Sequence, residues 1–167
     1  MIDPQQLISV ARLLSTPPRR GAPQQVKLRR AISSAYYAVF HHFIESATIE
    51  LIGVDRRQAS YAIIYRSFDH ADLRRACTQA QLPALSRELQ KAVGLPSFGA
   101  DIRECATFFV ELQQIRHEAD YNPTAKISLS DTRTAITKAE GAMAALDRAP
   151  AEERRVFLTL LHFKIRS

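Results

Sequence analysis

Apolar residues recur along this chain with the spacing of α-helices. Residues 28–43 contain no Gly or Pro, and one line of a helix drawn at 100° per residue is apolar throughout: Leu28, Ile32, Ala35, Val39 and Phe43. Tyr36 and Phe40 lie at the edge of that line. The pattern predicts a long central helix over about residues 23–51, ended by Gly53.

A second long helix is predicted over about residues 100–119. Its apolar positions follow helical spacing, and Arg116 takes the next place in the series after Ile102, Cys105, Phe109 and Leu112. A buried guanidinium is unfavourable unless it is paired, so Arg116 needs a partner. Asn122 and Pro123 end this helix.

Shorter elements flank the two long helices. Asp3 and Pro4 begin an N-terminal helix over residues 1–15, and the Pro-rich segment 16–23 is a surface linker. Ser128 and Asp131 form a capping box, with Asp in place of Glu, for a helix that runs to about residue 147. Pro150 opens a C-terminal helix over residues 150–165. Its apolar residues either pack within the bundle or form a dimer face: Phe157, Leu160, Leu161 and Ile165.

Three short helices are predicted between the long ones. Asp55 caps the first, which ends near residue 67 and buries Ala59, Ala62, Ile63 and Ile64. Asp69 caps the second, which ends at Ala80, and the third runs from Pro83 to Val93 and stops at Gly94. No segment shows the alternation of a strand. The chain is therefore predicted to be one all-α domain, 1–167, an antiparallel bundle of four or five main helices with short accessory helices and a core over about residues 25–147.

The charge of the chain changes this picture by suggesting a partner. The formal net charge is +6, which favours a polyanion or an acidic partner. Between residues 17 and 30 there are five basic residues and no acid: Arg19, Arg20, Lys27, Arg29 and Arg30. This run is either a phosphate-facing patch or a solvated basic turn.

The sequence lacks the motifs of disulfide-rich, membrane-spanning, metal-dependent and nucleotide-loop proteins. Cys77 and Cys105 belong to no CxxC pair and are expected to be reduced and packed. There is no signal-peptide pattern and no apolar run of membrane-spanning length, so we predict a cytoplasmic protein without a membrane partner. The sequence contains no GxxxxGK, HExxH or GxSxG motif, and we predict neither a metal nor a cofactor.

A polar stripe follows the central helix beside its apolar line. Four side chains share this stripe: Arg30, Ser34, Tyr37 and His41. Such a stripe can hold a phosphate or form an ordinary hydrogen-bonded seam. We interpret Arg30, Ser34 and Tyr37 as candidate substrate-binding residues, and Tyr36 as part of the core.

Two segments carry a family resemblance. The central helix reads Arg30-x-x-Ser33-x-x-Tyr36-Tyr37-Ala38-x-Phe40-His41, and the later helix ends in Arg116-His117-Glu118-Ala119-Asp120-Tyr121-Asn122-Pro123. Together they resemble small prokaryotic HEPN domains (higher eukaryotes and prokaryotes nucleotide-binding), over roughly residues 25–145. The resemblance implies a homodimer and metal-independent cleavage of RNA by an Arg and a His four to six residues later, often in a toxin–antitoxin or other defence system.

This sequence departs from that motif because the expected histidine is missing. Tyr121 lies five residues after Arg116, and His117 is adjacent to it and points about 100° away around the helix. His41 is the third candidate proton carrier, if it approaches Arg116 across the bundle. Asp120 is a candidate partner of Arg116 or part of a substrate site.

Three functions stay open on the sequence. The first is a HEPN-like RNA- or nucleotide-binding protein that acts as an endoribonuclease, with Arg116, His117, Tyr121 and His41 as catalytic candidates. The second is a non-catalytic HEPN module that dimerises and binds a partner such as a nucleotidyltransferase-like antitoxin, in which Arg116, Asp120 and Tyr121 form a structural polar cluster. The third is a nucleotide sensor, for which nucleotide should raise the thermal stability.

Overall fold

The computed structural model describes residues 2–55 and 59–163, and these residues form helices and connecting loops without a strand. The prediction of an all-α fold is therefore confirmed. The helices are α1 (Pro4–Leu14), α2 (Gln25–Ile52), α3 (Ala59–Ser67), α4 (His70–Ala80), α5 (Arg87–Val93), α6 (Ala100–Tyr121), α7 (Leu129–Arg148) and α8 (Ala151–Leu160).

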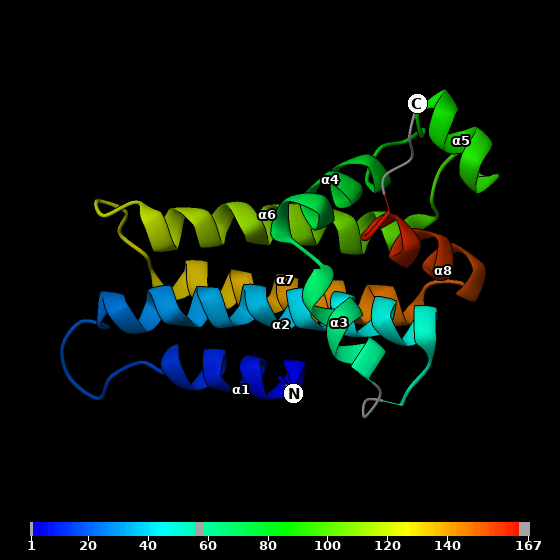
Figure 1. The fold of residues 1–167 in the computed structure, drawn as a ribbon. Helices are drawn as coiled ribbons and strands as arrows, with labels where there is room; N and C mark the ends of the chain where they lie inside the picture. The colour runs from blue at the N-terminus through cyan, green and yellow to red at the C-terminus, as the bar shows by residue number, and fades with distance from the viewer. Residues whose placement is uncertain (1, 56–58, 164–167) are drawn as a thin grey trace.

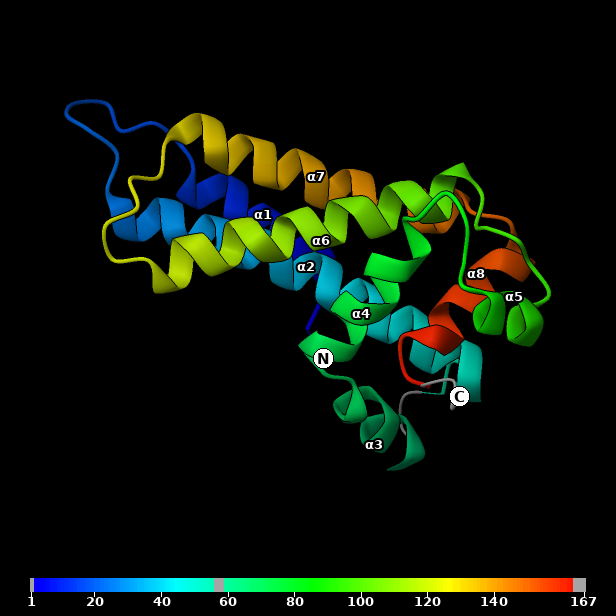
Figure 2. The ribbon, with the colours of Figure 1, turned by 90° about the horizontal axis from the view of Figure 1, so that it is seen from above.

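Four helices form the main bundle. Helix α2 packs against α1, α6 and α7, and α6 packs against α7. Figure 1 shows that α2 runs antiparallel to α1 and α6, and that α7 runs antiparallel to α6. The short helices α3, α4, α5 and α8 gather toward the end of the bundle where α2 finishes and α6 begins (Figure 2).

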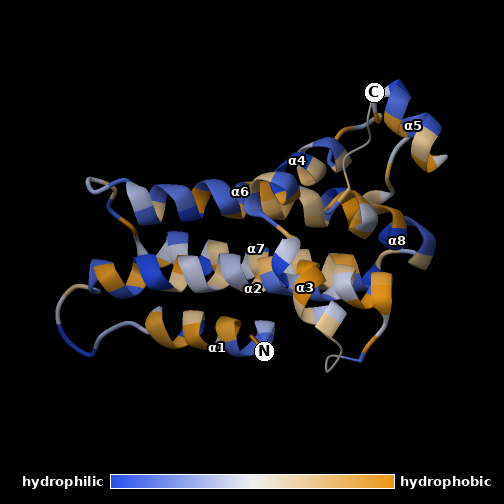
Figure 3. Ribbon diagram, viewed as in Figure 1, coloured by the Kyte–Doolittle hydropathy of each residue, from blue (hydrophilic) through white to orange (hydrophobic). Residues whose placement is uncertain are grey.

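The apolar line of the central helix lies in the core, as the sequence predicts. Each of its members is at most 2 % exposed: Leu28, Ile32, Ala35, Val39 and Phe43. The apolar series of α6 is also fully buried: Ile102, Cys105, Phe109 and Leu112. Figure 3 shows the C-terminal half of α6 coloured mainly as hydrophilic, so the polar end of this helix is set apart from its apolar beginning.

The ends of the helices follow the predicted capping residues in most places. The side chain of Asp3 accepts a hydrogen bond from the Gln5 N–H, and Asp69 accepts one from the Asp72 N–H. Gly94 ends α5 with a φ of 73°, a conformation that favours glycine. The start of α5 differs from the prediction: the helix begins at Arg87 and not at Pro83, because the Ser86 hydroxyl caps it by accepting from the Leu89 N–H.

Helix α3 buries a different face from the predicted one. The sequence predicts burial of Ala59, Ala62, Ile63 and Ile64, but the first three are exposed and Ile64 is only half-buried. Tyr61 is the buried residue of α3. Apolar residues occur on every side of this short helix, so hydrophobic spacing does not select the face that meets α2. The predicted start near Asp55 falls partly on residues 56–58, which lie outside the described residues.

The C-terminal helix packs within its own bundle. Phe157 and Leu161 are fully buried and Leu160 is 9 % exposed, and the Phe157 ring lies 5.9 Å from that of Phe43 and 6.1 Å from that of Phe98. Of the two predicted roles, packing against the bundle therefore holds for these residues, and Ile165 lies outside the described part of the chain.

Two further expectations concern the cysteines and the membrane. Cys77 and Cys105 are free and buried, as predicted, and burial raises the pKa of both thiols. None of the helices within the described residues is long and apolar enough to cross a membrane.

The start of α7 allows a direct test of the capping box. The Ser128 hydroxyl accepts from the Asp131 N–H, and the Asp131 carboxylate accepts from the Ser128 N–H. We expect Ser128→Ala to lower the free energy of unfolding by about 1 kcal/mol in urea denaturation, because one backbone N–H loses its acceptor. Ser130→Ala, two residues on within the helix, is the control and should change stability by less than about 0.5 kcal/mol.

Candidate active site

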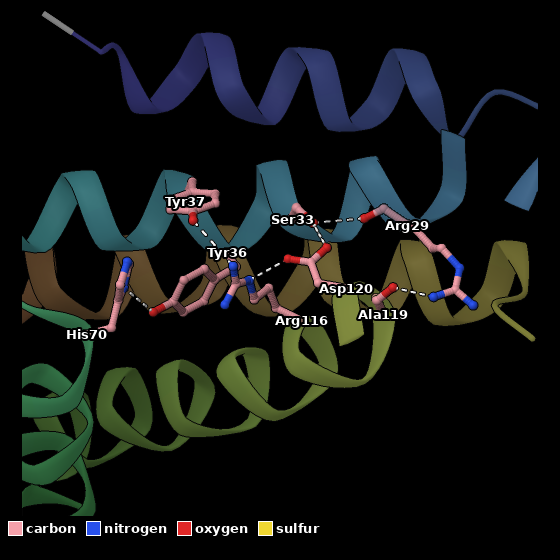
Figure 4. A network of polar contacts seen from close by, with 8 residues as sticks. All are labelled: Arg29, Ser33, Tyr36, Tyr37, His70, Arg116, Ala119 and Asp120. Carbon is pink, nitrogen blue, oxygen red and sulfur yellow. Dashed lines mark hydrogen bonds and ion pairs between the residues drawn. The ribbon is translucent and has the colours of Figure 1, made fainter. Parts of the chain in front are cut away.

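Polar side chains from two helices meet along the seam between α2 and α6. Ser33, Tyr36 and Tyr37 come from α2, and Arg116 and Asp120 come from the last two turns of α6. We call these five residues the Arg116 centre. Figure 4 shows them facing one another, with His70 at one side and Arg29 at the other.

The centre is built on an ion pair within α6. Arg116 Nε lies 2.6 Å from Asp120 Oδ2, and both side chains are only 18 % exposed. Asp120 Oδ1 accepts a hydrogen bond of 2.5 Å from the Ser33 hydroxyl, which fixes the carboxylate from the opposite helix. Burial alone would lower the pKa of Arg116, but the Asp120 carboxylate reverses this and the pKa is raised. Together the two side chains carry no net charge.

Three tyrosine rings surround the guanidinium. The Arg116 Cζ atom lies 5.7 Å from the ring centroids of Tyr36 and Tyr37 and 5.1 Å from that of Tyr121. Arg116 Nη2 also donates a long hydrogen bond of 3.4 Å to the Tyr37 hydroxyl. The Nε atom is buried without a hydrogen-bond acceptor in line with its N–H, so charge rather than alignment holds it to Asp120. The rings add cation–π attraction. Arg116 is therefore already engaged on several sides.

His70 joins the centre from α4, and sequence reasoning missed it. Its Nδ1 lies 2.8 Å from the Tyr36 hydroxyl, and its ring centroid lies 4.1 Å from that of Phe40. Burial lowers the pKa of His70, and the positive charge of Arg116 lowers it further. The Asp69 cap marks His70 as the first residue of a helix, but no spacing in the sequence says which long helix this short one meets.

His41 lies on the same side of α2 as Tyr37, one turn further along the helix. Its Nδ1 lies 2.7 Å from the Tyr65 hydroxyl on α3, and its ring centroid lies 6.2 Å from that of Tyr37. Burial lowers the pKa of His41, and His70 adds to the effect. Tyr37 thus contacts both His41 and Arg116, so its ring lies between these two catalytic candidates.

The other two candidate proton carriers lie near the surface. His117 is exposed, and its ring packs 5.0 Å from the ring of Tyr121. Tyr121 is 60 % exposed, and its ring packs against the Arg116 guanidinium at the outer edge of the Arg116 centre. His117 is therefore turned away from Ser33 and Asp120, as its position next to Arg116 on the helix predicts.

Two of the predicted substrate-binding residues, Arg30 and Ser34, do not make the contacts between α2 and α6, which come instead from the residues next to them. Arg30 is exposed and Ser34 is half-buried, whereas Ser33 bonds Asp120 and Arg29 reaches the end of α6. Arg29 Nη1 donates to the carbonyls of Ala119 and Asn122 at 2.5 and 2.9 Å, and Nη2 donates to that of Ala125 at 2.6 Å. Arg29 thereby gives a partner to the Ala119 carbonyl in the last turn of α6, and also binds two carbonyls of the loop that follows.

The two histidines should make stability depend on pH. Their folded pKa values lie below the ordinary 6.5, so the unfolded chain binds more protons just below that pH. We expect the free energy of unfolding to fall as the pH drops through 6.5, measured by urea denaturation between pH 7.5 and 5. His41→Asn and His70→Asn should each flatten this dependence, whereas His117→Asn, at an exposed position, should retain it. An unchanged slope in both the His41→Asn and the His70→Asn variants would refute this origin of the pH dependence.

Comparisons with known proteins give no indication of function, so the proposal below rests on the geometry of the Arg116 centre. Searches against family models, curated proteins and solved structures find no match to this chain. Among the residues that the structure describes, no three His, Cys, Asp or Glu side chains lie together as a metal ion would require. The HEPN resemblance therefore stays a resemblance of sequence motifs.

Proposed function

We propose that this chain is a non-catalytic HEPN-like helical module, which binds a partner without cleaving it. One observation carries the proposal: the Arg116 charge is compensated by Asp120, and Asp120 is itself fixed by Ser33. In this arrangement Arg116 stabilises the junction of α2 and α6.

A phosphate-cleaving centre needs the opposite electrostatics. Stabilising the extra negative charge of a pentacoordinate phosphate requires donors that are preorganised and free to face that charge. A phosphate bound to Arg116 would lie next to the Asp120 carboxylate, because both groups would contact the same guanidinium. The two negative charges would repel each other. The tyrosine rings also cover part of the guanidinium.

The resemblance limits the classes of partner. It implies RNA, a nucleotide or a nucleotidyltransferase-like antitoxin protein as the partner of a homodimer of this chain. The net charge of +6 supports an anionic partner.

The proposal is tested by incubating the purified protein with a mixed RNA pool in EDTA. We expect intact RNA with wild type and with Arg116→Ala alike, after circular dichroism has established that both are folded. Cleavage by wild type that the Arg116→Ala variant lacks would overturn the proposal.

A metal-independent endoribonuclease is the second candidate, because the structure gathers two histidines along the same seam. The lowered pKa values of His41 and His70 keep both imidazoles neutral near pH 7, which is the form that accepts a proton. If RNA is cleaved, His70→Asn and His41→Asn should identify the proton carrier. The control is His42→Asn, because the His42 imidazole pairs with Asp147 on α7.

A further inference from the structure

The positive charge of the chain is concentrated at one end of the bundle. Residues 15–30 and 114–135 contain eight Lys and Arg but three Asp and Glu, a net charge of +5 out of the +6 of the whole chain. They comprise the α1–α2 connection with the start of α2, and the end of α6 with the start of α7. Figures 1 and 2 both place these segments together, and we call them the basic end.

Specific contacts hold the segments of the basic end side by side. The Gln25 side chain exchanges two hydrogen bonds with the backbone of Ile127, of 2.8 and 2.9 Å. Arg29 bonds three carbonyls between Ala119 and Ala125. A surface hollow lined by Thr16, Pro17 and Arg133 brings the first connection next to α7. The charges are therefore presented on a connected surface.

Most of the basic side chains on this surface are available to a partner. Six are exposed and form no ion pair within the described residues: Arg19, Arg20, Lys27, Arg30, Lys126 and Arg133. The remaining two are Arg29, which binds carbonyls, and Arg116, which pairs with Asp120. The candidate centre thus adds no net charge to the basic end.

The acidic residues of the same end are engaged. Asp120 pairs with Arg116, and Asp131 accepts hydrogen bonds from the backbone and hydroxyl of Ser128, which lower its pKa. Glu118 accepts a hydrogen bond from the Asn122 amide. Glu118 and Asp131 stay exposed, so the exposed residues of the basic end carry six positive and two negative charges and the surface remains positive.

Exposed aromatic rings lie next to this charge. His117 and Tyr121 stand on the last turns of α6 with ring centroids 5.0 Å apart, and Tyr121 is 60 % exposed. Single-stranded nucleic acids are bound without sequence preference by basic grooves that follow the backbone and by aromatic rings on which bases stack. The rings beside the charge favour a nucleic acid over a partner that is attracted by charge alone.

We propose that the basic end binds the phosphate backbone of single-stranded nucleic acid, independently of base sequence. The proposal rests on the proposed function, binding without cleavage, and names both the partner and the surface. Arg19, Arg20, Lys27 and Arg30 contact phosphates from one side, and Lys126 and Arg133 from the other. Arg116 makes no phosphate contact.

The test compares two variants of equal net charge. The first combines Arg19→Gln, Arg20→Gln, Lys27→Gln and Arg30→Gln, and the control combines Arg66→Gln, Arg87→Gln, Lys91→Gln and Arg103→Gln, which are exposed and lie outside the basic end. Binding of a fluorescein-labelled 20-nucleotide RNA, and of DNA of the same sequence, is measured by anisotropy over a range of salt. We expect the first variant to bind about 100-fold more weakly in 0.1 M salt, with a shallower dependence on salt, and the control to bind within about threefold of wild type.

Each outcome separates this inference from the proposed function. No binding of RNA or DNA by wild type, or equal weakening in both variants, would overturn the basic end as the binding surface. Binding only to vesicles with anionic lipid, or only to a polyglutamate peptide, would overturn nucleic acid as the partner. Cleaved RNA on a gel of the same samples would overturn the non-catalytic function, while the DNA titration would still test the basic end.

Discussion

Replacing Asp120 with asparagine is expected to lower the free energy of unfolding by about 3 kcal/mol, because it leaves the Arg116 guanidinium mostly buried without its counter-charge. The Ser33 hydroxyl, which donates to Asp120, also loses its charged acceptor. The 18 % exposure of both side chains admits some water, which places the effect at the lower end of values for buried pairs. Urea denaturation at pH 7 measures the change.

Two controls distinguish the ion pair from the general effect of losing an acid. Asp101→Asn removes an acid from α6 whose partner Arg148 is 55 % exposed, and it should lower stability by less than about 1 kcal/mol. The double variant Arg116→Met with Asp120→Asn removes both charges and should recover most of the loss. A double variant as unstable as the sum of the two single variants would show that the pair is not coupled.

Replacing Arg29 with methionine is expected to lower the free energy of unfolding by about 3 kcal/mol, since its three hydrogen bonds to carbonyls are charge-assisted. These bonds attach the N-terminal part of α2 to the end of α6 and the loop that follows it. Amide hydrogen exchange should therefore speed up in residues 119–127 more than elsewhere in the bundle.

The adjacent arginine provides a matched control. Arg30 is exposed, and Arg30→Met should change stability by less than about 0.5 kcal/mol. Equal losses in the two variants would contradict the anchoring role of Arg29.

The fold could be predicted from this sequence because its signals are local and agree with one another. The apolar lines of α2 and α6 are long enough to select one face each, and Asp3, Asp69 and Ser128 mark helix starts. The need of Arg116 for a partner also follows from its place in an apolar series. Asp120, one turn further along, meets that need.

Details of the centre depend on packing between helices, which spacing alone does not give. Adjacent residues on a helix differ by 100°, so choosing Arg29 and Ser33 over Arg30 and Ser34 requires knowing where α6 crosses α2. His70 enters the centre only through the docking of α4. The exposed face of α3 has the same cause, because several of its faces are equally apolar.

The structure supports separate roles for the two regions. The Arg116 centre joins α2 to α6 as a neutral, largely buried cluster, whereas the basic end presents unpaired charge to solvent. Arg29 links them, since it holds the start of α2 against the segment that carries Lys126.

Nucleic-acid binding by the Arg116→Met, Asp120→Asn double variant tests this separation most directly. Removing both charges leaves the net charge at +6 and the basic end intact. We expect the variant to bind 20-nucleotide RNA within about threefold of wild type, since a lost phosphate contact would cost more, and the RNA to stay intact with both proteins. A folded double variant that no longer binds RNA, or wild-type protein that cleaves it, would assign the function to the Arg116 centre instead.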